Sequence, residues 1–247
     1  MRPLYACLMI CIIPVAVEAA PYSKTMESSS EIGAYLDHKL ACRMYLDSKY
    51  PSGSPGSKDA LERRIAAFKK DLIEDKEMPD EALAGTLKQI LPAMINLGME
   101  QEAIELCKAY SARYPGGNKY TIEVHYIAGI SCQKHGKYGV AIDLYRQGLN
   151  YPRDDGFTAN VRVNLGWCHY ARSEYSQAEQ EYKCAIESGR LDAVSAQWAW
   201  LETGRCRYFM KDYDGSIAAF KKVLSMNSGT EYARQAEANI NDIERIR

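Results

Sequence analysis

The sequence predicts an all-α protein, an α-α superhelix assembled from helical hairpins. Three observations support this fold class. Small and aromatic residues return in one register every 37 or 38 residues, and the residues between them place apolar side chains at helical spacing. The 247 residues are 47% hydrophobic, which is enough for a sizeable core. Tyr outnumbers Phe by 18 to 4, and five of the tyrosines fall in the repeating columns.

Charge excludes one class of partner. Lys and Arg together number 31 and Asp and Glu number 32, so the formal net charge is −1. Binding to a phosphate backbone requires a basic excess, which this chain lacks. We therefore expect no nucleic-acid partner.

The first segment, residues 1–19, resembles a secretory signal peptide. Arg2 provides a basic start, an apolar stretch follows over residues 4–17, and small residues close the segment at Ala19 and Ala20. The apolar stretch is shorter than the roughly 20 residues of a spanning helix, and Pro14 interrupts it. We therefore expect an exported protein with no stable membrane span after cleavage. The periplasm of a Gram-negative-type bacterium is the expected compartment, and secretion is the alternative.

The remaining elements follow in chain order. We expect disorder over residues 20–30 and an N-terminal helical hairpin over 31–80, whose helices are separated by the Pro, Gly and Ser residues of 51–57. Four repeat units follow, at 81–117, 118–155, 156–192 and 193–229. Residues 230–247 form an amphipathic helix, whose polar face suits a solvated cap on the stack.

Each repeat unit carries the same physical signature. A small residue permits close approach where the two helices of a hairpin cross, and a large aromatic residue fills the space beside the crossing. The first unit lacks the glycine and tyrosine columns and is the degenerate copy. The signature residues of the other three units are Gly129, Tyr138, Ala141 and Tyr145, then Gly166, Tyr175, Ala178 and Tyr182, then Gly204, Tyr213, Ser216 and Phe220. A hairpin cannot bury its apolar face alone, so the units must stack and leave an inner groove.

These columns resemble the tetratricopeptide repeat family, whose unit shows Leu-Gly, Tyr, Ala and an aromatic residue over about 34 residues. Leu165-Gly166 begins the best match, and Ser216 replaces the usual Ala in the last copy. The resemblance implies a right-handed solenoid of helical hairpins. The longer period and the closing Tyr151-Pro152 are similar to an exported bacterial branch. That branch includes the periplasmic coordinator of the Tol-Pal system and the lipoprotein of the outer-membrane β-barrel assembly machine.

The sequence contains no pattern that indicates catalysis, a cofactor or a metal. Phosphate loops, zinc-protease motifs and nucleophile elbows are missing, and the four His are scattered over different helical stretches. Six cysteines remain after signal cleavage, and their isolated pairings with His lack zinc-ligand spacing. We expect buried free thiols, although a disulfide such as Cys168 to Cys184 remains open. The protein is therefore expected not to be an enzyme.

The first helix of each hairpin is expected to line the groove. Aromatic residues and Arg dominate binding hot spots, so they are the favoured contacts. The predicted groove residues are Tyr126, Lys134, Asn160, Trp167, Tyr170, Trp198, Arg205 and Tyr208. Glu123, Gln133 and Phe209 project to the same side. Some aromatic residues of this stripe are expected to be core instead, because a helical aromatic stripe more often packs than binds.

Three functions follow from the sequence. The favoured one is an exported, non-enzymatic adaptor that binds a protein or peptide in its concave groove, in cell-envelope assembly or maintenance. The alternatives are a structural spacer that acts through its convex face and a role that depends on the thiols. The partner, the pathway and the oligomeric state are left open.

Overall fold

The computed structural model describes residues 65–66, 69–70, 72, 79–153 and 155–246. The chain divides into two compact units, residues 1–49 and 50–247, and every described residue belongs to the second. The predicted signal peptide, the predicted disordered segment and most of the predicted N-terminal hairpin lie outside the described residues. No helix in the described part is both long enough and apolar enough to cross a membrane.

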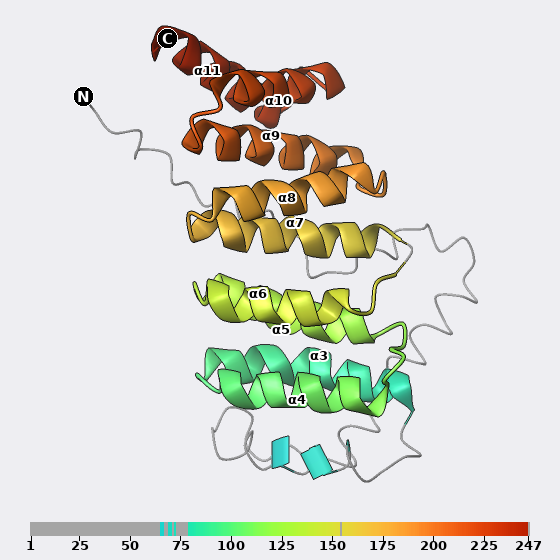
Figure 1. Cartoon of the computed structure of the whole chain (residues 1–247). Coiled ribbons are helices and arrows are strands. Elements are labelled where there is room, and N and C mark those ends of the chain that lie inside the picture. The colour runs from blue at the N-terminus through green and yellow to red at the C-terminus, as the bar shows by residue number, and fades with distance from the viewer. Residues whose placement is uncertain (1–64, 67–68, 71, 73–78, 154, 247) are drawn as a thin grey trace. The chain divides into compact units, whose positions relative to one another are not determined.

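All regular elements of the described residues are α-helices, which confirms the predicted fold class (Figure 1). Consecutive helices pair as hairpins, and the second helix of each hairpin packs on the first helix of the next. The hairpins thus stack in chain order as an α-α superhelix. The helices are α3 (Asp80–Asn96), α4 (Glu100–Arg113), α5 (Thr121–Lys134), α6 (Tyr138–Leu149), α7 (Gly156–Ala171), α8 (Tyr175–Glu187), α9 (Ala193–Phe209), α10 (Tyr213–Met226) and α11 (Glu231–Ile246).

A glycine on the first helix faces an aromatic ring on the second in three hairpins. The pairs are Gly129 with Tyr145, Gly166 with Tyr182, and Gly204 with Phe220. A Cβ atom added to Gly166 would lie only 2.7 Å from Cε1 of Tyr182. All three rings are fully buried. The close helix crossing therefore depends on a residue without a side chain.

The first hairpin, α3 with α4, inverts this arrangement. Leu91 and Cys107, both fully buried, hold the positions that glycine and the aromatic residue hold elsewhere. A large residue has moved to the first helix and a small one to the second, which preserves much of the core volume. Pro92 lies inside α3, and α3 packs more extensively on α5 than on α4. This hairpin therefore lacks the pairing of a glycine with an aromatic ring that the other three contain.

The turn within each hairpin is a Schellman motif. In the third hairpin the Ser173 N–H donates to the Tyr170 carbonyl at 2.8 Å, and the Glu174 N–H donates to the His169 carbonyl at 2.9 Å. The residue after the helix must adopt a positive φ. Glycine does so in the first two hairpins, but Ser173 (φ 62°) and Lys211 (φ 66°) do so in the last two.

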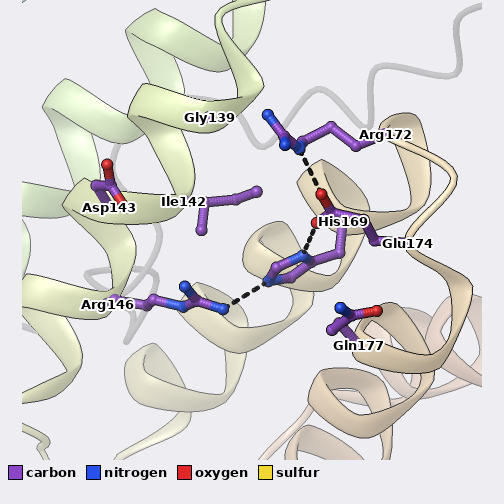
Figure 2. A pocket seen from close by; sticks show the side chains of 8 residues that line it. All are labelled: Gly139, Ile142, Asp143, Arg146, His169, Arg172, Glu174 and Gln177. Atoms are coloured by element: carbon purple, nitrogen blue, oxygen red, sulfur yellow. Dashed lines mark hydrogen bonds and ion pairs between the residues drawn. The ribbon is translucent and has the colours of Figure 1, made fainter.

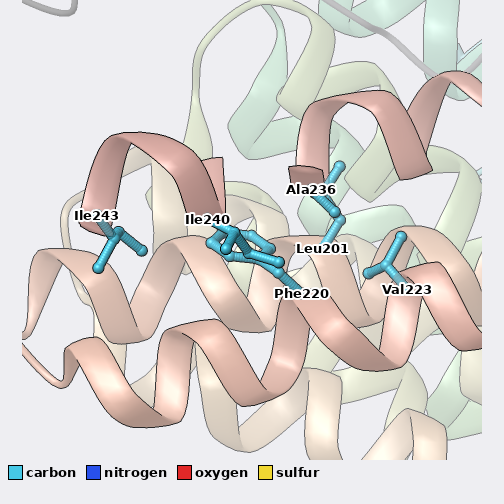
Figure 3. Close-up of a cluster of buried hydrophobic side chains, with 6 residues drawn as sticks. All are labelled: Leu201, Phe220, Val223, Ala236, Ile240 and Ile243. Carbon is cyan, nitrogen blue, oxygen red and sulfur yellow. The ribbon is translucent and has the colours of Figure 1, made fainter. Parts of the chain in front are cut away.

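The stack ends on α11. This helix turns Ala236, Ile240 and Ile243 onto α9 and α10, where they join a buried cluster (Figure 3). The buried side chain of Gln197 on α9 stabilises the connection between α10 and α11. Its Nε2 donates to the Val223 carbonyl at 3.0 Å and to the Asn227 carbonyl at 2.8 Å, and its Oε1 accepts from Thr230.

The described residues between 65 and 72 are helical and contact α4. Leu72 is buried, and its carbonyl accepts a hydrogen bond from Arg113 at 3.1 Å. Lys69 forms an ion pair with Glu105 at 2.8 Å. These contacts cover part of α4 on the N-terminal side of the stack.

Candidate interaction face

The eight predicted groove residues lie on α5, α7 and α9, but their exposure differs. Tyr126 and Trp198 are only 9% and 6% exposed. Tyr126 packs between Tyr145 and Phe157, and Trp198 packs edge-on against Tyr182 with the ring centroids 5.6 Å apart. These two side chains therefore belong to the packed layer between hairpins. Of the other predicted residues Lys134 is exposed, and the half-buried ones are Asn160, Trp167, Tyr170, Arg205 and Tyr208.

Five aromatic residues form a continuous surface across the third and fourth hairpins. We call this surface the aromatic face: Trp167, Tyr170, Tyr175, Tyr208 and Phe209. The ring centroids of Trp167 and Tyr170 lie 5.6 Å apart, those of Tyr170 and Phe209 lie 6.0 Å apart, and those of Tyr175 and Phe209 lie 4.7 Å apart at an interplanar angle of 9°. Tyr208 meets Phe209 edge-on at 5.6 Å.

Phe209 is the most open member of the aromatic face, at 48% exposed, and its neighbour Met210 is also exposed. Sequence reasoning assigned Tyr175 to the hairpin turn alone, and Met210 to no site. Their positions next to Tyr170 and Phe209 follow from the Schellman turns, which bring the end of one helix beside the start of the next. The ends of α7 and α9 thus expose an apolar aromatic surface.

Arg205 extends the aromatic face toward α11. Its Nη1 donates to Oε1 of Glu202 at 2.5 Å, and its Nη2 donates to Oε1 of Gln235 on α11 at 2.8 Å. Glu202 is 1% exposed. Burial raises the pKa of the Glu202 carboxyl, and the nearby Arg205 opposes that rise. Burial also raises the pKa of Tyr170, so this phenol is a neutral hydrogen-bonding group at physiological pH.

Ion pairs cross the earlier part of the predicted groove. Glu123 of α5 binds Lys88 of α3 and also Arg153, which precedes α7. Arg153 in turn binds Asp155 at 2.6 Å. These charges tie neighbouring hairpins together, so the α3 and α5 end of the groove is ionic whereas the α7 and α9 end is aromatic.

A separate cleft of about 420 Å³ lies between α6 and the turn joining α7 to α8 (Figure 2). His169, 3% exposed, is central to it: Nδ1 lies 2.6 Å from Oε2 of Glu174, and Arg146 donates to Nε2 at 3.4 Å. Because Arg has only donors, Nε2 accepts and Nδ1 carries the proton. Arg172 donates to Oε1 of Glu174 at 2.7 Å.

A chain of hydrogen bonds runs through the cleft from Arg146 to His169, Glu174 and Arg172. Both carboxylate oxygens of Glu174 are occupied, and the bonds from Arg172 and then His169 lower its pKa. The residues that line the cleft include no Ser, Thr, Cys or Lys. The chain joins α6 of one hairpin to the turn of the next, and we assign it a structural part.

The five cysteines in the described residues are free, and four of them are buried. Cys168 and Cys184, the pair left open by the sequence, are both free. Burial raises the pKa of Cys132 to about 11 and that of Cys168 to about 12. The thiolate is the reactive species, so these buried thiols are unreactive at neutral pH. No group of three or more His, Cys, Asp or Glu in the described part could hold a metal ion.

Comparisons with known proteins agree with this geometry at the level of the fold. Residues 198–228, which span most of α9 and all of α10, match the family model described as a tetratricopeptide repeat. No curated protein matches the chain. Among solved structures, BtubC from P. vanneervenii is similar with a TM-score of 0.51 at 14% identity, covering 68% of this chain and 73% of that one.

Two further structures are similar with lower scores. A MamA protein has a TM-score of 0.49 at 20% identity and covers 76% of this chain and 92% of its own. The second tetratricopeptide repeat domain of human RPAP3, solved with an HSP70 peptide, has a TM-score of 0.42 at 22% identity. It covers 50% of this chain and 98% of its own.

Proposed function

We propose that this chain is a non-enzymatic interaction scaffold whose first helices bind a protein or peptide partner. The family match over residues 198–228 supports a scaffold of the tetratricopeptide type. The observation that carries the proposal is the aromatic face, which runs across two hairpins and ends in the exposed Phe209. Large aromatic residues supply most of the energy at protein interfaces, and here they are already held in place by each other.

The proposed binding surface is narrower than the stripe expected from the sequence. Trp167, Tyr170, Tyr208 and Phe209 present ring surface, and Arg205 adds a fixed guanidinium. Trp198 packs next to this surface, with its ring centroid 6.2 Å from that of Trp167, whereas Tyr126 packs one hairpin earlier against Tyr145 and Phe157. Removing one exposed anchor of this kind costs roughly 2 kcal/mol or more, which is about 30-fold in affinity.

The test compares two double variants in a crosslinking pull-down from the cell envelope, with the captured proteins identified by mass spectrometry. Trp167→Ala with Tyr208→Ala should remove the specific partner while circular dichroism shows unchanged helicity. The matched control, Gln180→Ala with Lys221→Ala, changes two exposed residues of second helices and should leave capture intact. If only the control variant loses the partner, the protein acts through its convex face and the proposal fails.

We also propose that the scaffold is exported and serves the assembly or maintenance of a cell envelope. The support is the apolar segment over residues 4–17 with its small-residue exit. Fractionation of cells that express the full chain should place it outside the cytoplasm, with a mature N-terminus near Ala20. A cytoplasmic protein with an intact N-terminus would reject this part and leave the scaffold proposal standing.

A further inference from the structure

The carboxylate of Glu202 is buried with only half of its hydrogen-bonding capacity used. Its Oε1 accepts from Arg205 at 2.5 Å, whereas its buried Oε2 has no partner within the described part. A second buried polar atom, the hydroxyl of Tyr182, also has no partner there. The two groups are within electrostatic reach, because Glu202 adds to the rise in the pKa of Tyr182 that burial causes.

Neighbouring hairpins do not share this arrangement. In the second hairpin the Tyr145 hydroxyl, at the position of Tyr182, donates to Oε1 of Gln133 at 2.8 Å. The residue in the third hairpin that corresponds to Gln133 is Tyr170, a ring of the aromatic face that offers no amide oxygen. In the fourth hairpin Phe220 has no hydroxyl to satisfy. Only the layer between α8 and α9 combines an unpaired phenol with a half-paired acid, among the three hairpins compared.

We propose that Glu202 is a positioning residue for Arg205 at the binding face, and that protonation of Glu202 releases this arginine. The inference rests on the proposed function, because Arg205 matters only if the face binds a partner. Under this proposal, pH controls whether Arg205 is available to the partner.

The two protonation states of Glu202 treat Arg205 differently. When ionised, Glu202 holds the guanidinium with a charge-assisted bond, and its buried Oε2 stays unpaired. A buried charged oxygen without a partner is costly, and this cost favours the neutral acid. When neutral, Glu202 loses its charge-assisted attraction to Arg205.

Other titratable and charged groups face Glu202 from the neighbouring helices. Tyr170 on α7, Tyr182 on α8 and Cys206 on α9 all have a raised pKa, with burial as the first cause, and remain neutral. Glu179 on α8 forms an ion pair with Arg207 at 2.7 Å. On α11, Gln235 contacts Arg205 without carrying charge. Glu202 is the ionisable group that is hydrogen-bonded directly to Arg205.

Release of Arg205 changes the chemistry of the face. While Glu202 is ionised, its charge balances that of the guanidinium, and both Nη atoms are occupied by Glu202 and Gln235. After protonation the guanidinium carries an uncompensated charge and a free donor edge beside the aromatic rings. The face then favours a partner group with oxygen acceptors, such as a carboxylate.

The test observes the arginine side chains of the full chain without its first 19 residues by ¹⁵N NMR, with Arg205→Lys used for assignment. Between about pH 8 and about pH 4.5 the Arg205 Nε signal should move with one midpoint above 4.5, the ordinary pKa of Glu. Glu202→Gln should abolish this titration.

An Arg205 signal that stays still in the unchanged protein, or that titrates equally in Glu202→Gln, would overturn the proposal. Circular dichroism of each variant establishes that it is folded, and Glu202→Leu provides a second neutral variant if Glu202→Gln is not. The experiment uses no partner, so it separates the two proposals. If Arg205 titrates as expected but Trp167→Ala with Tyr208→Ala leaves capture intact, the binding function fails while the positioning role stands.

Discussion

Tyr182 and Tyr145 hold equivalent positions in adjacent hairpins, yet substitution by Phe should affect stability in opposite directions. The Tyr182 hydroxyl is buried without a hydrogen-bond partner, a state that costs about 1–3 kcal/mol. Tyr182→Phe removes that cost and keeps the ring that fills the crossing with Gly166, so it should stabilise the protein by about 1–3 kcal/mol. Tyr145→Phe removes a 2.8 Å hydrogen bond to Gln133 and should destabilise it by about 0.5–1.5 kcal/mol.

Urea unfolding of the three proteins at about pH 7 measures these differences, provided that the dependence on urea concentration stays the same. In a domain of this size each 1 kcal/mol corresponds to a change in Tm of about 2–4 °C, so thermal unfolding provides a second reading. Equal destabilisation by both substitutions would show that the Tyr182 hydroxyl is paired in solution.

Three further predictions concern the hairpins. Ser173→Gly and Lys211→Gly should each stabilise the protein by about 1 kcal/mol in urea unfolding, because glycine adopts their positive φ without strain; a loss would refute this. Gly166→Ala should cost about 1–3 kcal/mol through its clash with the Tyr182 ring, whereas Gly85→Ala, with open space around it, should be neutral or stabilising. Burial lowers the pKa of His125 to about 4, so folding favours the neutral imidazole. The stability that this preference contributes is fully present above about pH 6.5. As the pH falls from about 6.5 to about 4, roughly 3 kcal/mol should be lost, and urea midpoints of His125→Gln should lack this loss.

The fold class could be predicted because its signals are local and periodic. A glycine, an aromatic residue sixteen positions later and the same pair one period further along are visible without any knowledge of the third dimension. The first hairpin could not be interpreted in the same way. Leu91 and Cys107 occupy the two positions with the large and the small residue exchanged. A search for the glycine column therefore finds only a degenerate copy.

The binding face was harder to predict because exposure depends on how hairpins stack. Trp167 and Trp198 occupy first helices in adjacent repeats, but Trp198 is buried against Tyr182 whereas Trp167 is half-buried. Trp167 directly follows the glycine of its hairpin, whereas Trp198 lies six residues before Gly204, and the sequence alone does not show which of these two positions the stacking leaves exposed. The groove residues therefore stay predictions, and the aromatic face combines three of them, Trp167, Tyr170 and Tyr208, with Tyr175 and Phe209.

The cleft beside α6 could not be predicted from the sequence either. Where α8 meets the next hairpin, Glu179 and Arg207 form an ion pair at 2.7 Å. One repeat earlier these positions are Ile142 and His169, which cannot form that pair, and His169 turns to Glu174 and Arg146 instead. A sequence pattern identifies each residue, but the cleft arises from the pairing between two elements.

Leu91 and Cys107 in the first described hairpin and the Gln197 connection at the last one set these two hairpins apart from the two between them. The hairpins between them each contain their own glycine and its aromatic partner, so each of these hairpins carries the whole packing motif. Duplication of an internal hairpin could therefore lengthen the chain without new core residues, whereas duplication of either end would place a terminal feature in the interior. Growth of this array over evolution is expected to occur from the middle.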